Sequence, residues 1–287
     1  MSLQALQSFF GQLIHQTPLG LLAFGILLLL LASYFSGRMV RLRHGRGDEA
    51  HLEADDFAAN SVTAAIGLLA LLLGFTFALA ADRFDSRRKM VTEEANAISS
   101  TYLMAQTFED PDRTRLSAVL RAYGHVRLEA GRATKIAVAM KLVRQSDELQ
   151  QQFWAAALVA VKDRRDAVSS AFLQSGYNMI DVGSAREAVR RATIPVRILT
   201  ALTLYMAITA FLLGFATTEK PRIAVPLLVL VTMAVLLILD LDGPTSGGIQ
   251  EPQMAMEKLQ RQLEPSATTY PLAEPAETRR TPSTPTR

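Results

Sequence analysis

The hydrophobic residues of the chain gather in four stretches without a charged side chain, residues 18–36, 57–81, 198–218 and 223–239. Each stretch is close to the ~17–25 residues that a helix needs to cross a bilayer. Elsewhere the apolar positions recur at helical spacing, and no segment alternates long enough to indicate a strand. We therefore predict an all-α polytopic membrane protein with four transmembrane helices, two within residues 18–81 and two within residues 198–239.

The segments at the two ends differ in character from the spans. Residues 1–17 place apolar side chains at helical spacing without any Lys, Arg, Asp or Glu, which predicts an amphipathic leader in the membrane interface. The leader has no basic start and no small-residue cleavage site, so we expect it to be retained. Residues 240–263 form a membrane-proximal segment, and residues 264–287, rich in Pro, Thr, Ser, Ala and Glu, are expected to be a disordered tail.

Residues 82–197 are predicted to form a helical bundle that is continuous with the second and third spans. After Ala81 no Gly or Pro occurs before Pro111, so the helix of the second span is expected to run on to about residue 108. Asp110 suits the N-cap of a helix that ends near Glu129, where Gly131 offers a stop. Further helices are predicted over residues 135–142, 147–161 and 166–191, with Ser184 as a candidate cap inside the last.

Composition narrows the chemistry that the chain can perform. It has no cysteine, which excludes disulfides, thiolate catalysis and cysteine-ligated metal centres. The four histidines fall in different segments, and neither a HExxH pair, a GxSxG elbow nor a phosphate-binding glycine loop is present. We therefore expect no enzyme activity and no cofactor. Residues 82–197 carry a net charge of about +5 without a nucleic-acid motif, so a solvated face near lipid headgroups is favoured over nucleic-acid binding.

Charge also bears on orientation. If all four spans insert, the middle region and both termini share one side of the membrane, where nine lysines and arginines lie close to the bilayer against six on the other side. The positive-inside rule then places the bundle and both termini in the cytoplasm, for a bacterial inner-membrane protein. The first span argues the opposite, because it has no positive charge before it and four arginines after it.

One stripe of the second span carries small or polar residues and a single leucine, spaced three or four apart: Asn60, Thr63, Gly67, Leu71, Gly74, Ala78 and Ala81. The other faces are bulky. Small residues at this spacing let a second helix approach closely in lipid, so a packing seam is one interpretation. The other is that the stripe faces the axis of an oligomer and lines a pore with an apolar neck, with Asn60 and Thr63 at one mouth.

The remaining candidate residues are polar groups near the membrane faces. Asp240 and Asp242, just past the fourth span, could bind a cation, although interfacial carboxylates are more often paired or hydrated. Two polar clusters lie close to the second and third spans and are typical of solvated or arginine-paired groups, with ligand contact as the alternative: Glu93, Glu94 and Asn96, and Asn178, Asp181 and Arg186. No span contains an internal charged residue or histidine, which disfavours a proton relay or an ion-coupled transporter.

The run over residues 72–103, which contains GFTFALAADRFDSRRKMVTEEANAISSTYL, resembles the signature of the bestrophin-like domain family of bacterial and plant membrane proteins. Three later pieces are similar to that family: NMID at residues 178–181 followed by Arg186, Ile194-Pro195 before the third span, and ILDLDGP at residues 238–244. The family usually has arginine where Gly243 stands. The resemblance covers about residues 57–263.

The resemblance implies a plan shared with bestrophins, which are pentameric anion channels. Their second transmembrane helix lines an apolar neck and extends into a helical cytoplasmic region. By this analogy we expect a homo-oligomer in the lipid bilayer that passes small anions. A non-catalytic sensor or scaffold, with the bundle binding a ligand or partner, is the alternative. A stator-type proton channel shares the layout, but the missing intramembrane carboxylate argues against it.

Overall fold

The computed structural model describes residues 19–44, 51–164, 166–216, 224–243 and 248–264. The described residues contain helices and no strands: α2 (Leu19–His44), α3 (His51–Ala105), α4 (Asp112–Arg132), α5 (Ile136–Ala160), α6 (Ala167–Arg191), α7 (Val196–Ala216), α8 (Ala224–Asp242) and α9 (Met254–Leu263). This confirms the all-α prediction. The predicted leader and nearly all of the predicted tail lie outside the described residues.

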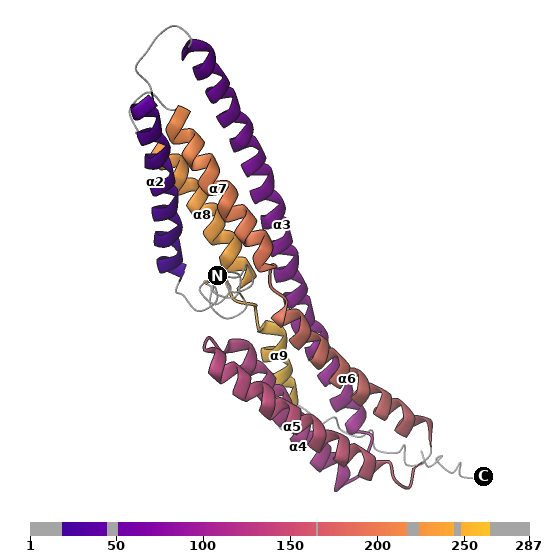
Figure 1. Cartoon of the computed structure of the whole chain (residues 1–287). Coiled ribbons are helices and arrows are strands. Elements are labelled where there is room, and N and C mark those ends of the chain that lie inside the picture. The colour runs from indigo at the N-terminus through magenta and orange to yellow at the C-terminus, as the bar shows by residue number, and fades with distance from the viewer. Residues whose placement is uncertain (1–18, 45–50, 165, 217–223, 244–247, 265–287) are drawn as a thin grey trace, which may run out of the picture.

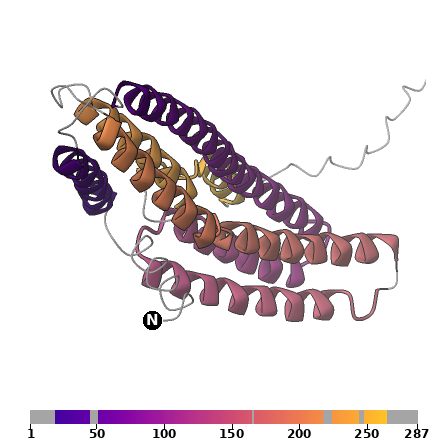
Figure 2. The same cartoon turned by 45° about the horizontal axis from the view of Figure 1, so that its top comes forward.

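The helices form two groups, a membrane group and the bundle, and the long helix α3 belongs to both (Figure 1). Four helices, α2, α7, α8 and the first part of α3, lie together, and four stretches of the described chain are long and apolar enough to cross a membrane. The second part of α3 packs with α6, α4 and α9. In Figure 2, α6 and α7 follow one another end to end beside α3, with a bend between them. Helix α3 is unbroken through both groups, whereas residues 192–195 separate the end of α6 from the start of α7.

Each group has its own hydrophobic core. In the membrane group, Leu30 and Tyr34 of α2 are buried with Leu69, Met206 and Leu228 of the other three helices. In the bundle, the core residues come from α3, α4, α5, α6 and α9, and include Ile98, Leu116, Leu120, Phe153, Phe172 and Leu259. The Phe172 ring packs edge-on against Phe108 at 4.8 Å between centroids. Apolar side chains at helical spacing thus bury one face of each bundle helix.

In the membrane group, the backbones of α2 and α7 are in direct contact. A Cβ atom on Gly214 would overlap the carbonyl of Tyr34, and one on Gly37 would overlap the carbonyl of Phe211. Both positions therefore require glycine, as in other close helix contacts in lipid. Near the same end, the Arg41 guanidinium donates to the carbonyl of Phe215 at 2.9 Å, which satisfies a group that the end of α7 leaves unpaired.

Two helices continue beyond the charge-free stretches that predicted them. Helix α2 runs past residue 36 through Arg38, Arg41 and Arg43 to His44. Arginines are good helix formers, so the end of the apolar run does not end the helix. Likewise α8 continues to Asp242, so Asp240 and Asp242 lie in its last turn rather than beyond it.

Two predictions for the bundle are also corrected. Residues 135–142 and 147–161 belong to one helix, α5, because the intervening Ser146 is buried and donates its hydroxyl to the Val143 carbonyl instead of capping a new helix. Pro111, not Asp110, occupies the N-cap position of α4, and the Asp110 carboxylate accepts from the Thr114 hydroxyl at 2.6 Å.

Gly131 and Ser184 also differ from their predicted roles. Gly131 lies inside α4, which ends at Arg132. A Cβ atom there would overlap the Gln253 side chain, so the glycine serves a close contact rather than a helix stop. Ser184 lies within α6 and donates to the Ile180 carbonyl, whereas Asp166 caps α6 by accepting from the Ser169 amide at 2.7 Å.

Candidate functional site on helix α3

The stripe of the second span lies on the uncovered face of α3. Six of its seven residues are exposed in the single chain, Asn60, Thr63, Gly67, Leu71, Gly74 and Ala78, whereas Ala81 is half-buried. A Cβ atom on Gly67 or Gly74 would meet no atom within 4 Å. The opposite side of the helix is buried at Val62, Leu69 and Ala80. Among the described residues, the stripe therefore packs against no other helix of the chain.

The exposed stripe continues below the apolar part of α3. At the same spacing of three or four residues, the exposed positions after Ala78 are Asp82, Asp85, Lys89, Thr92, Asn96, Ser100 and Leu103. From Asn60 to Leu103 this face extends for about 65 Å at 1.5 Å per residue. Its composition changes along the way: small and neutral within the predicted span, acidic directly below it, then mixed and polar.

The predicted polar clusters are divided by the structure. Glu94 is fully buried, whereas Glu93 is exposed beside Lys89 and Asn96 is exposed on the stripe. Among the residues near the third span, Arg186 is buried and contacts Glu94, while Asn178 and Asp181 are exposed on α6. Glu94 and Arg186, one residue from each predicted cluster, thus meet in a third site, which neither local sequence pattern indicated.

Glu94 is the centre of a buried polar network in the bundle. Its Oε1 accepts from Arg127 Nε at 2.6 Å and from the Tyr123 hydroxyl at 3.1 Å. Its Oε2 accepts from Arg186 Nη1 at 2.5 Å. The Gln150 amide donates to the Tyr123 oxygen at 3.0 Å. One carboxylate therefore connects α3 with α4 and α6, and charged hydrogen bonds fill its acceptor sites.

The network perturbs the titration of its members on α4. Burial and the adjacent Glu94 carboxylate raise the pKa of the Tyr123 hydroxyl well above its usual range, so Tyr123 remains a hydrogen-bond donor. Burial alone would lower the pKa of the Arg127 guanidinium, but the Glu94 carboxylate outweighs burial and raises it. Both shifts favour a fixed arrangement of donors around Glu94 at neutral pH.

A second set of buried charges joins the bundle to the membrane helices. Arg87 pairs with Glu251 at 3.2 Å and donates to the Asp242 carbonyl at 3.3 Å. The Asp242 carboxylate, 2% exposed as a residue, accepts from the backbone N–H of Ile194 at 3.0 Å. The end of α8 is thereby fixed to α3 and to the segment before α7.

The structure gives both cation candidates hydrogen-bond partners. Asp240 accepts from the Gly248 amide at 2.6 Å, and Asp242 is bonded to Ile194. Across the described ranges, no group of three or more His, Asp or Glu side chains is placed to hold a metal ion. Nothing in the geometry adds to the cation interpretation.

Sequence reasoning missed Arg87, Arg127, Arg190 and Glu251. Arg127 could have been found, because it occupies the helical position that follows Leu116, Leu120 and Tyr123 on the apolar face of α4. Glu94 similarly falls between the buried Val91 and Ile98. A charged residue at a core position predicts a buried partner.

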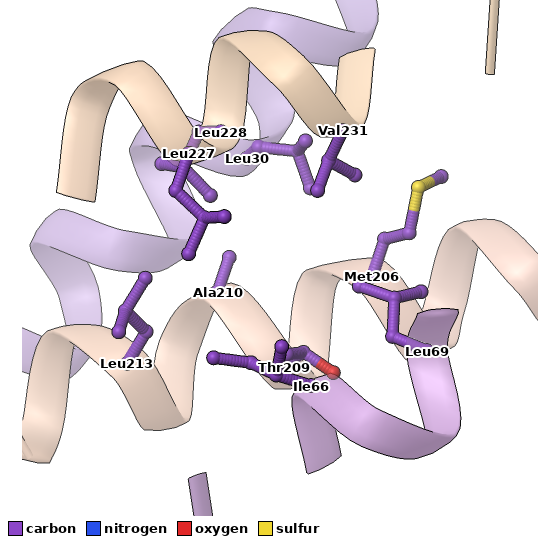
Figure 3. Close-up of a pocket in the computed structure, with 10 residues that line it drawn as sticks. All are labelled: Leu30, Ile66, Leu69, Met206, Thr209, Ala210, Leu213, Leu227, Leu228 and Val231. Atoms are coloured by element: carbon purple, nitrogen blue, oxygen red, sulfur yellow. The ribbon is translucent and has the colours of Figure 1, made fainter. Parts of the chain in front are cut away.

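The membrane group also contains a small cavity (Figure 3). Its volume is about 30 Å³, and the lining side chains come from α2, α3, α7 and α8, including Leu30, Ile66, Met206 and Leu228. The hydroxyl of Thr209 at the wall donates to the Tyr205 carbonyl. An apolar cavity of this size offers an ion no hydrated path.

Comparison with solved structures shows the same fold. A bacterial bestrophin homologue from Klebsiella pneumoniae, solved as a single-substitution variant, aligns with a TM-score of 0.59 and 13% identity, covering 83% of this chain and 98% of its own. A second variant of that homologue gives a TM-score of 0.57 and 16% identity, covering 83% of this chain and 97% of its own. A crystal structure described as a membrane protein gives 0.60 and 14%, covering 84% and 97%.

A search of curated proteins gave no match. The sequence pattern of the bestrophin-like domain matches residues 26–250, which run from within α2 to the segment between α8 and α9. This is well over half of the chain, and the solved bestrophin homologues share its helical plan. The chain belongs to the bestrophin-like family.

Proposed function

We propose that the chain is one subunit of a homo-oligomeric ion channel in which the exposed stripe of α3 surrounds the pore. The observation that carries the proposal is the exposure of every stripe residue from Asn60 to Ala78 while the opposite face of α3 is packed. A ring of copies placed around this face would cover it without displacing any helix of the chain. Membership of the bestrophin-like family supports the same arrangement.

The stripe has the composition of a narrow apolar neck. Gly67, Leu71, Gly74 and Ala78 present no polar side chain, and Leu71 is the bulkiest of the four. Apolar constrictions stop ions by losing water, so they gate without a charged group. Leu71 is accordingly the proposed narrowest level.

The proposed ion is a small anion. The bundle carries the basic surplus of the chain, which would concentrate anions below the neck, and the family resemblance points to the same ion. The carboxylates of Asp82 and Asp85 act against anion passage at the mouth of the neck. The chain needs no catalytic group or cofactor for this function.

The test is ion flux through the purified protein in planar bilayers, with reversal potentials measured in a salt gradient. Gly74→Trp is expected to abolish conductance, because the indole would fill the neck. Leu230→Trp is the matched control, since Leu230 is 63% exposed on α8, away from the stripe, and should conduct like the parent. Asp85→Asn is expected to raise the ratio of anion to cation permeability. Conductance that is unchanged in Gly74→Trp contradicts a pore along this stripe.

The mass of the Gly74→Trp complex separates the two interpretations of the stripe. A variant that keeps its assembly but loses conductance supports a pore. A variant that falls apart into single chains identifies the stripe as a packing seam between copies.

We further propose that the bundle lies in the cytoplasm of a bacterial inner membrane, as the larger count of nearby lysines and arginines favours. The cysteine-free chain allows a direct test. A single Tyr177→Cys substitution, at an exposed position of α6, should resist a membrane-impermeant thiol reagent in intact cells and react after lysis. Reaction in intact cells would reverse the orientation.

A further inference from the structure

The start of α5 is an exposed apolar end of the bundle. Ile136, Val138 and Met140 are 51%, 46% and 56% exposed, and residues 134–138 are exposed on all sides of the helix. Helix α5 packs along α4, and these first turns follow directly after the connection that joins the two helices. Three large apolar side chains exposed within five residues form a hydrophobic patch, and such a patch is typical of an interaction surface.

The same segment is positively charged. Lys135, Lys141 and Arg144 are exposed, and no Asp or Glu occurs between Glu129 and Asp147. Among the described residues, no salt bridge joins these three cations to an acidic side chain. Apolar side chains surrounded by unpaired lysine and arginine are typical of segments that enter the interface of an anionic membrane.

The fold turns this segment toward the membrane. Arg190, which lies shortly before the first residue of α7, donates to the Ala130 carbonyl at 2.7 Å, so the end of α4 is tied to the region where α7 begins. In Figure 1, the turn from α4 into α5 is the end of this pair that faces α2, and the other end of α5 points away. Figure 2 shows the same relation.

We infer that residues 134–144 are a surface anchor that inserts Ile136, Val138 and Met140 into the interface of the bilayer and binds anionic lipid headgroups through Lys135, Lys141 and Arg144. Anionic lipid is the proposed partner because its headgroups neutralise the three cations of the segment, whereas a contact with the same segment of another copy would bring six cations together. The anchor does not depend on channel activity.

The absence of cysteine allows one probe to be placed at a time. Val138→Cys and Val159→Cys each replace an exposed valine of α5, and the two positions are about 31 Å apart along the helix. Val159 is the matched control because it lies at the far end. Each full-length variant is labelled with an environment-sensitive fluorophore. It is then reconstituted in vesicles of phosphatidylcholine and phosphatidylglycerol, about 2 to 1, that contain a nitroxide-labelled lipid.

The anchor predicts that nitroxide lipid quenches the probe at residue 138 at least about twofold more than the probe at residue 159. It also predicts that Lys135→Glu combined with Lys141→Glu, or vesicles without phosphatidylglycerol, reduces the quenching at residue 138. Equal quenching at the two positions would overturn the anchor. Blue-shifted emission at residue 138 without quenching would also overturn it, because another protein copy would then be covering the segment.

Discussion

Two adjacent glutamates of α3 lie in opposite environments. Glu94 is fully buried between Arg127 and Arg186, whereas Glu93 is exposed and pairs with Lys89 at 3.7 Å. Their sequence context is nearly the same. The difference arises because Glu94 occupies the face of the helix that meets α4 and α6.

Glu94→Gln is expected to destabilise the bundle strongly. Removing the carboxylate leaves two buried guanidinium groups without a countercharge, and breaking a buried ion pair in this way costs about 3–5 kcal/mol. Glu93→Gln is the matched control, because an exposed pair four residues apart on a helix contributes only about 0.3–0.5 kcal/mol. Thermal unfolding in detergent measures both. Equal melting temperatures for the two variants would refute the central place of Glu94.

Gly214→Ala tests the contact between α2 and α7. The added methyl group would overlap the Tyr34 carbonyl, so the two helices would have to separate, and overpacking of this kind costs about 1–3 kcal/mol. Gly25→Ala provides the comparison, since a Cβ atom at Gly25 meets nothing within 4 Å. The expected result is a lower melting temperature for Gly214→Ala alone. A Gly214→Ala protein as stable as Gly25→Ala would show that the helices do not approach so closely.

At the scale of the element, the short helix α9 packs across the bundle. Met256, Leu259 and Leu263 face inward and are buried against α3 and α4, while Met254 is 69% exposed. The Gln253 side chain just before the helix accepts from Arg186 at 3.2 Å. Helix α9 and the residue before it thus connect the hydrophobic core with the network around Glu94.

Leu259→Ala is expected to weaken the packing of α9 on the bundle. Truncating a buried leucine costs about 2–5 kcal/mol, and here the loss falls on a helix of only 10 residues. The measurement is limited proteolysis of the detergent-solubilised protein, with cleavage within α9 expected to accelerate. Met254→Ala should be cleaved at the parental rate. If Leu259→Ala also resists cleavage, α9 is held by other contacts.

The sequence predicts helices well where the apolar period is long and uninterrupted. The four spans and the continuity of α3 follow from such runs, because no Gly or Pro stops the helix after Gly74. Boundaries within polar segments are less predictable. The two helices predicted in place of α5 came from a polar stretch around Ser146, which tertiary packing buries.

The candidate site was predictable only in part, for a related reason. The stripe is a local pattern of one helix, so its spacing can be read from the chain, and its exposure adds what spacing cannot show. The partners of Glu94 lie 33 and 92 residues away along the chain. Local spacing does not specify contacts over such separations, so the network required the fold.

At the scale of the whole molecule, the proposed pore depends on what surrounds the uncovered face of α3. That face runs through both helical groups (Figure 1), so a ring of copies would build a neck in the membrane and a wider passage between the bundles. The buried hydrogen bonds that join α8 to α3 and to the segment before α7 would hold the neck and the bundle in register within each copy, together with the Arg87–Glu251 ion pair.

The most direct test of this arrangement is the mass of the purified, detergent-solubilised protein, corrected for bound detergent. The account predicts a closed ring, with a mass of at least about three times the 31.4 kDa of one chain and five as the number that the bestrophin plan implies. A single chain or a simple dimer would contradict a pore on the axis. The stripe would then be a lipid-facing or packing surface, and the bundle a sensor or scaffold.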